Sequence, residues 1–320
     1  KAVCVSVDKR PLTNDKVLSA LNEPLQLFLN RHSLPDSYLT NADAYFSPLI
    51  EGFTEVYRQK NATQIIGING CQGSGKSTLA DYLCTRIADE QGVQTLALSM
   101  DDFYCTKAQR KKLSDTIHPL LATRGVPGTH DIDLAIDTIT ALSSGIPTPI
   151  TRFNKSTDER VALSDSKIIK GPVALIVIEG WCFGAQPVSQ SDLLEASNDL
   201  EQQHDANGVW RQYVNSKLKG NYQRLFNMAD RLVMLAAPSF DRVFEWRLEQ
   251  EQKLAQSIKL KGNGNIGKKS MTEKEVKHFI TYFQRITEHC LLEMPARADH
   301  LFRLNNDRSI RSYNRLSIKG

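Results

Sequence analysis

The residues best suited to chemistry in this chain form one glycine-rich run. The run has the spacing G-x-x-x-x-G-K-S and is followed by a threonine: Gly70, Cys71, Gln72, Gly73, Ser74, Gly75, Lys76, Ser77 and Thr78. Glycines allow backbone conformations in which successive N–H groups face phosphate oxygens, and a following helix adds the partial positive charge of its N-terminus. In this pattern the lysine contacts the β- and γ-phosphates, and the serine hydroxyl binds Mg²⁺. We therefore expect ATP and Mg²⁺ here; the alternative is a glycine-rich turn with a chance lysine.

Three carboxylates follow two further apolar runs. Asp101 and Asp102 come after the run at 93–98, and Glu179 comes directly after the run at 173–178. Ligands of open α/β sheets lie at the carboxyl ends of the strands, so these side chains are placed for function. Asp101 is our candidate general base, and we expect Glu179, Ser77 and Asp101 around the metal. The alternative for Asp101 and Asp102 is a pair of loop caps.

Polar side chains in two proline- and glycine-containing segments are candidates for binding a second substrate. Arg124, His130 and Asp131 lie in the first segment, and Arg152 and Lys155 lie in the second. Arginine binds carboxylates through a bidentate fork, so an anionic acceptor suits these segments. Solvated surface loops are the alternative, and Asp131 is also placed to cap a helix at 132–142.

The elements that must position these residues alternate between strand and helix. Apolar runs predict parallel strands at 65–68, 93–98, 173–178, 231–236 and 299–304, and helical spacing predicts helices at 17–29, 42–57, 78–89, 132–142, 209–228, 240–258 and 272–292. We interpret 105–130 as irregular, 147–156 as extended, and 183–208 as loop with a short helix at 191–196. This alternation predicts an α/β fold with a doubly wound five-stranded parallel sheet flanked by helices.

The domain organisation follows from this pattern. We expect a helical N-terminal extension at residues 1–63 and the main domain at residues 64–320. Within that domain we expect a helical lid at 240–272. It would include a glycine-rich, basic, mobile loop at 259–270 and would close over ATP.

Composition sets limits on partners and compartment. The 320 residues carry a net charge of +4, with 41% hydrophobic and 24% charged residues, which is too mild a charge to indicate nucleic-acid binding. No apolar stretch approaches 18 residues, so no membrane partner is expected. The six cysteines contain no C-x-x-C pair, and one lies inside the glycine-rich run, which indicates a reducing cytoplasm. The oligomeric state is not given by these features.

The glycine-rich run, the stretch at 98–104 and the stretch at 178–180 resemble the uridine kinase, phosphoribulokinase and pantothenate kinase group of P-loop kinases. More narrowly, the stretches at 124–134, 149–156, 177–184, 244–251 and 270–276 are similar to plant-type D-glycerate 3-kinases and their microbial relatives. The resemblance covers about residues 64–307. It implies an ATP-dependent kinase that phosphorylates a hydroxyl of a small acid, D-glycerate giving 3-phosphoglycerate.

The resemblance also implies roles for individual residues. Asp101 matches the base, with Lys76 and Arg247 stabilising the transferring phosphoryl group and Arg242 as a second arginine of the lid. The acceptor side is matched by Asp102, Tyr104, Arg124, His130, Asp131, Arg152 and Lys155. After Ser156 the chain departs from the family pattern, because the stretch at 157–161 replaces a glycine-containing run. Another acceptor (pantothenate, a nucleoside or a sugar phosphate) and a non-catalytic ATP-binding regulator therefore remain alternatives.

Overall fold

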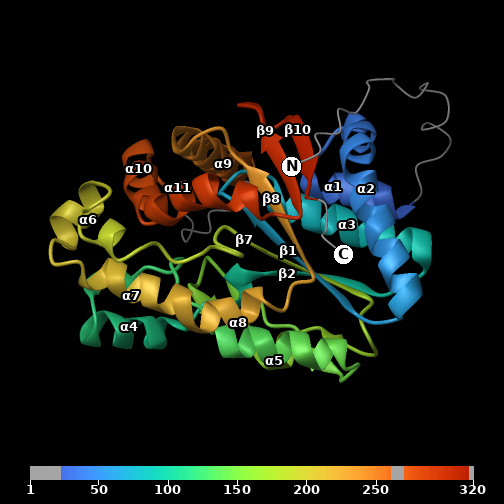
Figure 1. Cartoon of the computed structure of the whole chain (residues 1–320), viewed down its shortest axis with the longest axis horizontal. Helices are drawn as coiled ribbons and strands as arrows, with labels where there is room; N and C mark the ends of the chain where they lie inside the picture. The colour runs from blue at the N-terminus through green and yellow to red at the C-terminus, as the bar shows by residue number, and fades with distance from the viewer. Residues whose placement is uncertain (1–22, 261–269, 317–320) are drawn as a thin grey trace.

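The computed structural model describes residues 23–260 and 270–316. A single sheet with the strand order β10-β9-β8-β1-β7-β2 runs through the molecule (Figure 1). Its strands are β1 Gln64–Gly70, β2 Thr95–Ser99, β7 Leu175–Gly180, β8 Arg231–Ala236, β9 His300–Leu304 and β10 Ile310–Arg315. The first five run parallel, so the predicted five-stranded parallel sheet is confirmed.

The sixth strand, β10, is absent from the prediction. It pairs antiparallel with β9 at the sheet edge, and most of its residues are half-buried or exposed. Its sequence, IRSYNR, has no apolar run because only one of its faces packs on protein. An edge strand of this kind leaves almost no hydrophobic signal in the sequence.

The register of β1, β7 and β2 determines where functional side chains gather. Glu179 of β7 pairs with Ile68 of β1 on one side and with Ser99 of β2 on the other. Parallel strands end at the same edge of a sheet. The loop after β1, the segment after β2 and Glu179 therefore lie together.

Helices cover both faces of the sheet through two separate apolar clusters. One cluster joins β1 to α1 Glu23–His32, α2 Ser37–Lys60, α3 Lys76–Gln91 and α9 Phe240–Leu260. The other joins the opposite face to α5 Ile132–Ser143, α7 Val209–Lys217, α8 Gln223–Phe226 and α11 Gln284–Glu293. This two-sided arrangement confirms the predicted fold class. Among the described helices, none has both the length and the hydropathy needed to cross a bilayer.

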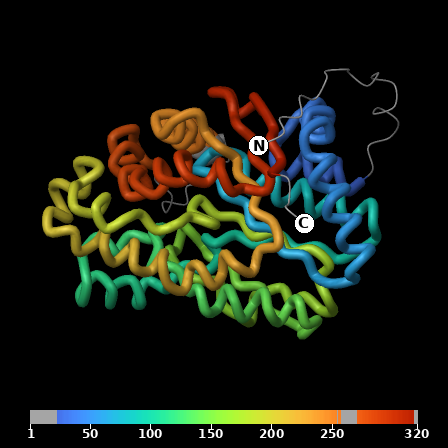
Figure 2. The backbone as a smooth tube through the Cα atoms, viewed as in Figure 1, coloured from blue at the N-terminus to red at the C-terminus, as the bar shows by residue number. Residues whose placement is uncertain are grey.

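The N-terminal helices pack closely on the sheet domain. The rings of Phe46 in α2 and Phe302 in β9 lie 5.0 Å apart, and Figure 2 shows the blue helices beside the red strands. Helices α1 and α2 correspond to the predicted helices at 17–29 and 42–57, with residues before Glu23 outside the described part. Helices α1 and α2 share one apolar core with β1 and α3, so this packing does not mark a boundary between residues 63 and 64. The predicted domain boundary there stays a prediction.

The interpretation of 105–130 as irregular is wrong. Helix α4 Lys107–Thr116 begins there with a capping box between Thr106 and Gln109, and a 3₁₀ turn, Pro119–Ala122, follows. The helix was missed because its sequence, KAQRKKLSDT, has no apolar face and buries only Arg110. A short helix, α6 Asp199–His204, likewise lies in the segment at 183–208 that we interpreted as loop.

Three predicted helices differ in continuity or type. The helix predicted at 209–228 is interrupted between α7 and α8, where Gly220 has φ −91° and ψ −115°. The helix predicted at 272–292 divides into α10 Glu273–Thr281 and α11. The short helix predicted at 191–196 is a 3₁₀ turn, Ser191–Leu193. The predicted loop at 259–270 falls largely on residues 261–269, outside the described part.

Gly67 in β1 provides a test of the packing beneath the site. A Cβ at this position would lie 1.9 Å from Cε1 of the fully buried Phe183. We expect Gly67→Ala to lower the free energy of unfolding by about 1–3 kcal/mol through overpacking, measured by urea denaturation. Gly52→Ala is the control, because Gly52 lies inside α2 with nothing within 4 Å of the added carbon. It should raise stability by about 0.5–1 kcal/mol. Unchanged stability of Gly67→Ala would contradict the tight contact.

Candidate active site

The phosphate loop joins β1 to α3 and lies against helix α9. Gly73 and Gly75 have φ of +80° and +90°, and α3 begins directly after them at Lys76. A Cβ on Gly73 would lie 2.7 Å from Cβ of Trp246 in α9. Gly73 is therefore required both by its backbone conformation and by the close approach of the helix.

Lys76, Ser77 and Glu179 meet at the base of this loop. The Ser77 hydroxyl donates to Oε1 of Glu179 at 2.7 Å, and Lys76 Nζ lies 3.8 Å from Oε2. Glu179 is 5% exposed, and within residues 23–260 and 270–316 its Oε2 accepts no hydrogen bond. Such a buried oxygen is costly unless a ligand completes its contacts. A hydroxyl and a carboxylate are oxygen donors that suit Mg²⁺, so this pair fits the metal expected from the sequence.

No larger acidic or histidine cluster competes for a metal. In residues 23–260 and 270–316, no group of three or more His, Cys, Asp or Glu side chains is placed to hold an ion. Asp101, which we also expected near the metal, contacts other residues, and its role there stays a prediction.

Asp101 lies in the 3₁₀ turn Met100–Phe103 that follows β2. The Tyr104 hydroxyl donates to its Oδ1 at 2.7 Å, and Lys155 Nζ donates to its Oδ2 at 2.5 Å. Burial alone would raise the pKa of Asp101, but the charges of Lys155 and Lys76 hold that pKa below its usual value. Burial and the neighbouring Asp101 raise the pKa of Tyr104, so its hydroxyl stays protonated and donates. Asp101 is therefore an ionised acceptor beside the phosphate loop.

Asp102 connects the same turn to a short hairpin, β4 Phe153–Asn154 and β5 Glu159–Arg160. Its Oδ2 lies 2.5 Å from NH1 of Arg152, and its Oδ1 accepts from the Phe153 N–H at 3.2 Å. Together with the Lys155–Asp101 pair, this attaches the hairpin to the end of β2. Arg152 and Lys155, predicted as substrate residues, are thus both brought to the site, each paired with a carboxylate.

Asp158 at the tip of this hairpin was missed in the sequence. It has φ +58°, pairs with Arg124 through Oδ1, and accepts from NH2 of Arg110 through Oδ2 at 2.7 Å. Arg110 is 3% exposed, whereas Arg124 is partly exposed and lies with its guanidinium 5.6 Å from the Phe153 ring centre. Burial raises the pKa of Asp158, but hydrogen bonding and charge from Arg110 and Arg124 lower it below its usual value. Two guanidiniums therefore share one ionised carboxylate.

His130 lies behind Asp101 in a fully protein-lined position. Its ring centre is 4.7 Å from that of Tyr104, and its Nδ1 lies 2.6 Å from the Tyr222 hydroxyl oxygen. The Nε2 atom is buried without a hydrogen-bond partner among the described residues. Burial lowers the pKa of His130 to about 4. It is neutral at neutral pH and offers a ligand a hydrogen bond but no charge.

Asp131 fills one of the two roles considered for it, the helix cap, while its contact with a substrate stays a prediction. Its Oδ1 accepts from the Leu134 N–H at 3.1 Å, which confirms it as the cap of α5. Its Oδ2 lies 3.0 Å from NH2 of Arg160, whose Nε donates to the Tyr104 carbonyl at 2.8 Å. Arg160 was also missed, since it lies in the stretch that departs from the family pattern.

The remaining predicted residues lie around the loop with other partners. Arg242 pairs with Glu245 and Arg247 with Glu251, both within α9, so their predicted contact with a phosphoryl group stays a prediction. Burial raises the pKa of Cys71 to about 12, which makes it an unreactive thiol. Thr78 Oγ1 lies 3.4 Å from Nδ1 of His32 in α1.

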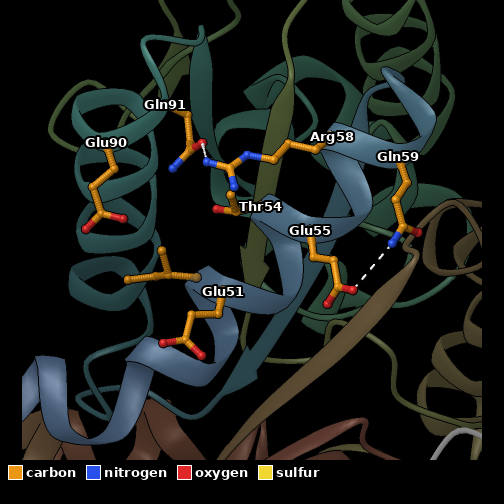
Figure 3. A pocket seen from close by; sticks show the side chains of 8 residues that line it. Glu51, Thr54, Glu55, Arg58, Gln59, Glu90 and Gln91 are labelled. Carbon is orange, nitrogen blue, oxygen red and sulfur yellow. Dashed lines mark hydrogen bonds between the residues drawn. The ribbon is translucent and has the colours of Figure 1, made fainter.

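A surface groove of about 460 Å³ lies elsewhere, between α2 and α3. Figure 3 shows Arg58 of α2 extending to Gln91 of α3, with a hydrogen bond of 2.9 Å. Gln91 ends α3, and the phosphate loop precedes its first residue, so the helix separates the two by about 20 Å. This groove is therefore distinct from the site described above.

Solved structures place the fold. A D-glycerate 3-kinase from Cryptococcus neoformans superposes with a TM-score of 0.67 at 23% identity, covering 83% of this chain and 96% of that one. The YGR205w protein superposes with a TM-score of 0.64 at 23% identity, covering 88% and 98%. The phosphate loop at the carboxyl end of β1 in this parallel sheet defines a P-loop kinase fold.

Sequence relatives then place the chain in a family. The "Uncharacterized kinase mug58" of Schizosaccharomyces pombe is 31% identical over 229 residues, which is 68% of this chain and 78% of that protein. The chain belongs to this family of ATP-dependent kinases. The chloroplastic D-glycerate 3-kinase of Arabidopsis thaliana is 28% identical over 232 residues, with 46% of its own length covered. The "Probable ATP-dependent kinase TDA10" of Saccharomyces cerevisiae is 26% identical over 227 residues. No protein-family model matches the chain.

The buried neutral state of His130 predicts a pH dependence of stability. Its pKa is about 4 in the folded protein against 6.5 for the free side chain, so the unfolded chain binds more protons between these values. Stability should therefore fall as the pH falls from about 6.5 toward 4, with about 2 kcal/mol lost between pH 7 and pH 5 from this residue. Urea unfolding at both pH values measures this. In His130→Gln the loss should be smaller by about that amount; an equal loss in the variant would contradict the prediction.

Proposed function

We propose that the chain transfers the γ-phosphoryl group of ATP to a hydroxyl of a small carboxylic acid, D-glycerate, giving 3-phosphoglycerate. The observation that carries the acceptor class is the shared carboxylate of Asp158. Arg110 and Arg124 both pair with this one side chain, so the pair has one positive charge in excess. The partly exposed member, Arg124, is the ligand for the acceptor carboxylate.

The nucleotide half of the proposal rests on the phosphate loop. Its N–H groups and Lys76 bind the β- and γ-phosphates, and Ser77 and Glu179 hold Mg²⁺, which when bound offsets phosphate charge. The positive charge of Lys76 acts on both Glu179 and Asp101. Its Nζ lies 3.8 Å from Glu179 Oε2, and its charge lowers the pKa of Asp101. It therefore links the phosphates to the acceptor side.

The acceptor half rests on the turn after β2. Asp101 accepts the proton of the acceptor hydroxyl as the oxygen attacks the γ-phosphate in line. Tyr104 orients the carboxylate through its 2.7 Å hydrogen bond. Lys155 donates to Oδ2, but a carboxylate oxygen accepts more than one hydrogen bond, so Asp101 can still receive the acceptor proton. Arg247, on the helix that packs against Gly73, then stabilises the transferring group.

The names of the relatives support D-glycerate as acceptor. One sequence relative and one structural neighbour are D-glycerate 3-kinases, while another relative is an uncharacterised kinase. We infer a cytoplasmic kinase that uses Mg-ATP.

Replacing the proposed base separates chemistry from binding. Asp101→Asn should leave the affinity for Mg-ATP nearly unchanged and lower kcat by about a hundredfold or more, because the acceptor proton loses its base. Steady-state kinetics and calorimetric titration measure the two effects. Asp133→Asn is the control, since Asp133 is an exposed residue whose partner is Arg224 of α8. An unchanged kcat in Asp101→Asn would remove Asp101 from this role.

An acceptor panel tests the substrate. Acceptor-dependent ADP release should be strong with D-glycerate and weak with L-glycerate, glycerol, pantothenate, uridine and ribulose 5-phosphate. Arg124→Gln should raise the KM for D-glycerate by about tenfold or more and leave the KM for ATP unchanged, because a charged hydrogen bond to the carboxylate is lost. Arg224→Gln, at an exposed arginine on α8, is the control. Equal turnover of glycerol and D-glycerate would contradict the carboxylate requirement.

A further inference from the structure

Arg308 connects three parts of the molecule that are distant in sequence. It lies in the turn between β9 and β10, 235 residues after its partner Gly73. Its Nε donates to the Gly73 carbonyl at 2.8 Å, and its NH2 donates to Oε2 of Glu249 at 2.5 Å. Its guanidinium also lies 5.3 Å from the Trp246 ring centre. One side chain thus contacts the phosphate loop, helix α9 and the last hairpin.

The contact on the loop holds one peptide group from its carbonyl side. The carbonyl of Gly73 and the N–H of Ser74 belong to one planar peptide and point in opposite directions. A guanidinium that holds the carbonyl on the outer side therefore fixes the orientation of the Ser74 N–H. This N–H donates to the Cys71 carbonyl at 3.2 Å. The Gly73–Ser74 peptide is thus held at both ends, by Arg308 outside the loop and by the Cys71 carbonyl within it.

The contacts on α9 join the helix to the same carbonyl. Trp246 packs against Gly73 and donates from Nε1 to the Asn306 carbonyl at 2.8 Å, while Glu249 pairs with Arg308. Arg308 has φ +70°, a conformation that a non-glycine residue keeps only where its surroundings enforce it. The turn is therefore constrained so that its side chain lies between the loop and the helix.

We propose that Arg308 is a positioning residue for nucleotide binding, which keeps the phosphate loop in its binding conformation and couples it to helix α9. The proposal rests on the nucleotide half of the proposed function and is independent of the acceptor. A purely structural role in the hairpin would affect stability alone. A positioning role affects the affinity for nucleotide in a protein that remains folded.

Calorimetric titration of the full chain with Mg-ADP tests this, with thermal unfolding of each variant measured in the absence of nucleotide. Arg308→Ala should weaken Mg-ADP binding by about tenfold, because the loop loses a charged hydrogen bond that orders it. Arg308→Lys should be intermediate, since an ammonium group keeps the charge but lacks the planar fork that spans Gly73 and Glu249. Arg311→Ala, at an exposed arginine on the same hairpin, should bind Mg-ADP as the wild type does.

Two results would overturn the proposal. One is a folded Arg308→Ala variant whose affinity for Mg-ADP lies within about twofold of the wild type. The other is an equal loss in Arg311→Ala. If Arg308→Ala does not fold, Arg308→Lys decides: an intermediate affinity supports the proposal, and a wild-type affinity overturns it. Absence of Mg-ADP binding in the wild type would overturn the nucleotide half of the proposed function together with this proposal, whereas failure of D-glycerate as acceptor leaves this test unaffected.

Discussion

A buried carboxylate at the carboxyl end of β7 is the constraint on which the site depends. One oxygen of Glu179 accepts from Ser77, and the other faces Lys76 without a hydrogen bond. A buried carboxylate oxygen without a hydrogen bond among the described residues is costly in an ordinary core, and the metal that we propose for this site would complete its contacts beside Lys76. Because β7 lies between β1 and β2, the same strand end adjoins both the phosphate loop and the turn that carries Asp101. The strand order therefore brings the phosphate and acceptor sides together.

Charge pairing organises the acceptor side in a different way. Every cation we expected to bind substrate there has a carboxylate partner: Lys155 with Asp101, Arg152 with Asp102, and Arg124 with Asp158. The anionic acceptor that we propose would therefore bind by exchanging with a side-chain carboxylate rather than by filling an unoccupied positive pocket. Such an exchange costs least where two guanidiniums share one carboxylate, because one of them can pair with the ligand while the other keeps Asp158. For the proposed acid acceptor, this favours Arg124 as the partner of its carboxylate.

The sequence predicted the sheet well and its periphery poorly, for one physical reason. Strands β1 and β7 are buried and read as apolar runs, and the phosphate loop is encoded by glycines whose positive φ no other residue adopts easily. Helix α4 and strand β10 bury little apolar surface, so their sequences have no periodic signal. The interruption at Gly220 is a local departure from helical φ and ψ, which helical spacing alone does not reveal.

The site was predictable to the extent that each residue acts through its own type and position. Lys76, Ser77, Asp101 and Glu179 follow strands, so pattern and strand order sufficed to bring them together. Asp158 and Arg308 form ion pairs with residues of other segments that are distant in sequence. Both have positive φ values, which the residue types aspartate and arginine do not predict. The hairpin that carries Asp158 is also where the chain departs from the family pattern. The residues expected to act in phosphoryl transfer therefore follow from the strands and the glycine-rich loop, whereas the hairpin that we propose for the acceptor has contacts that only the folded chain reveals.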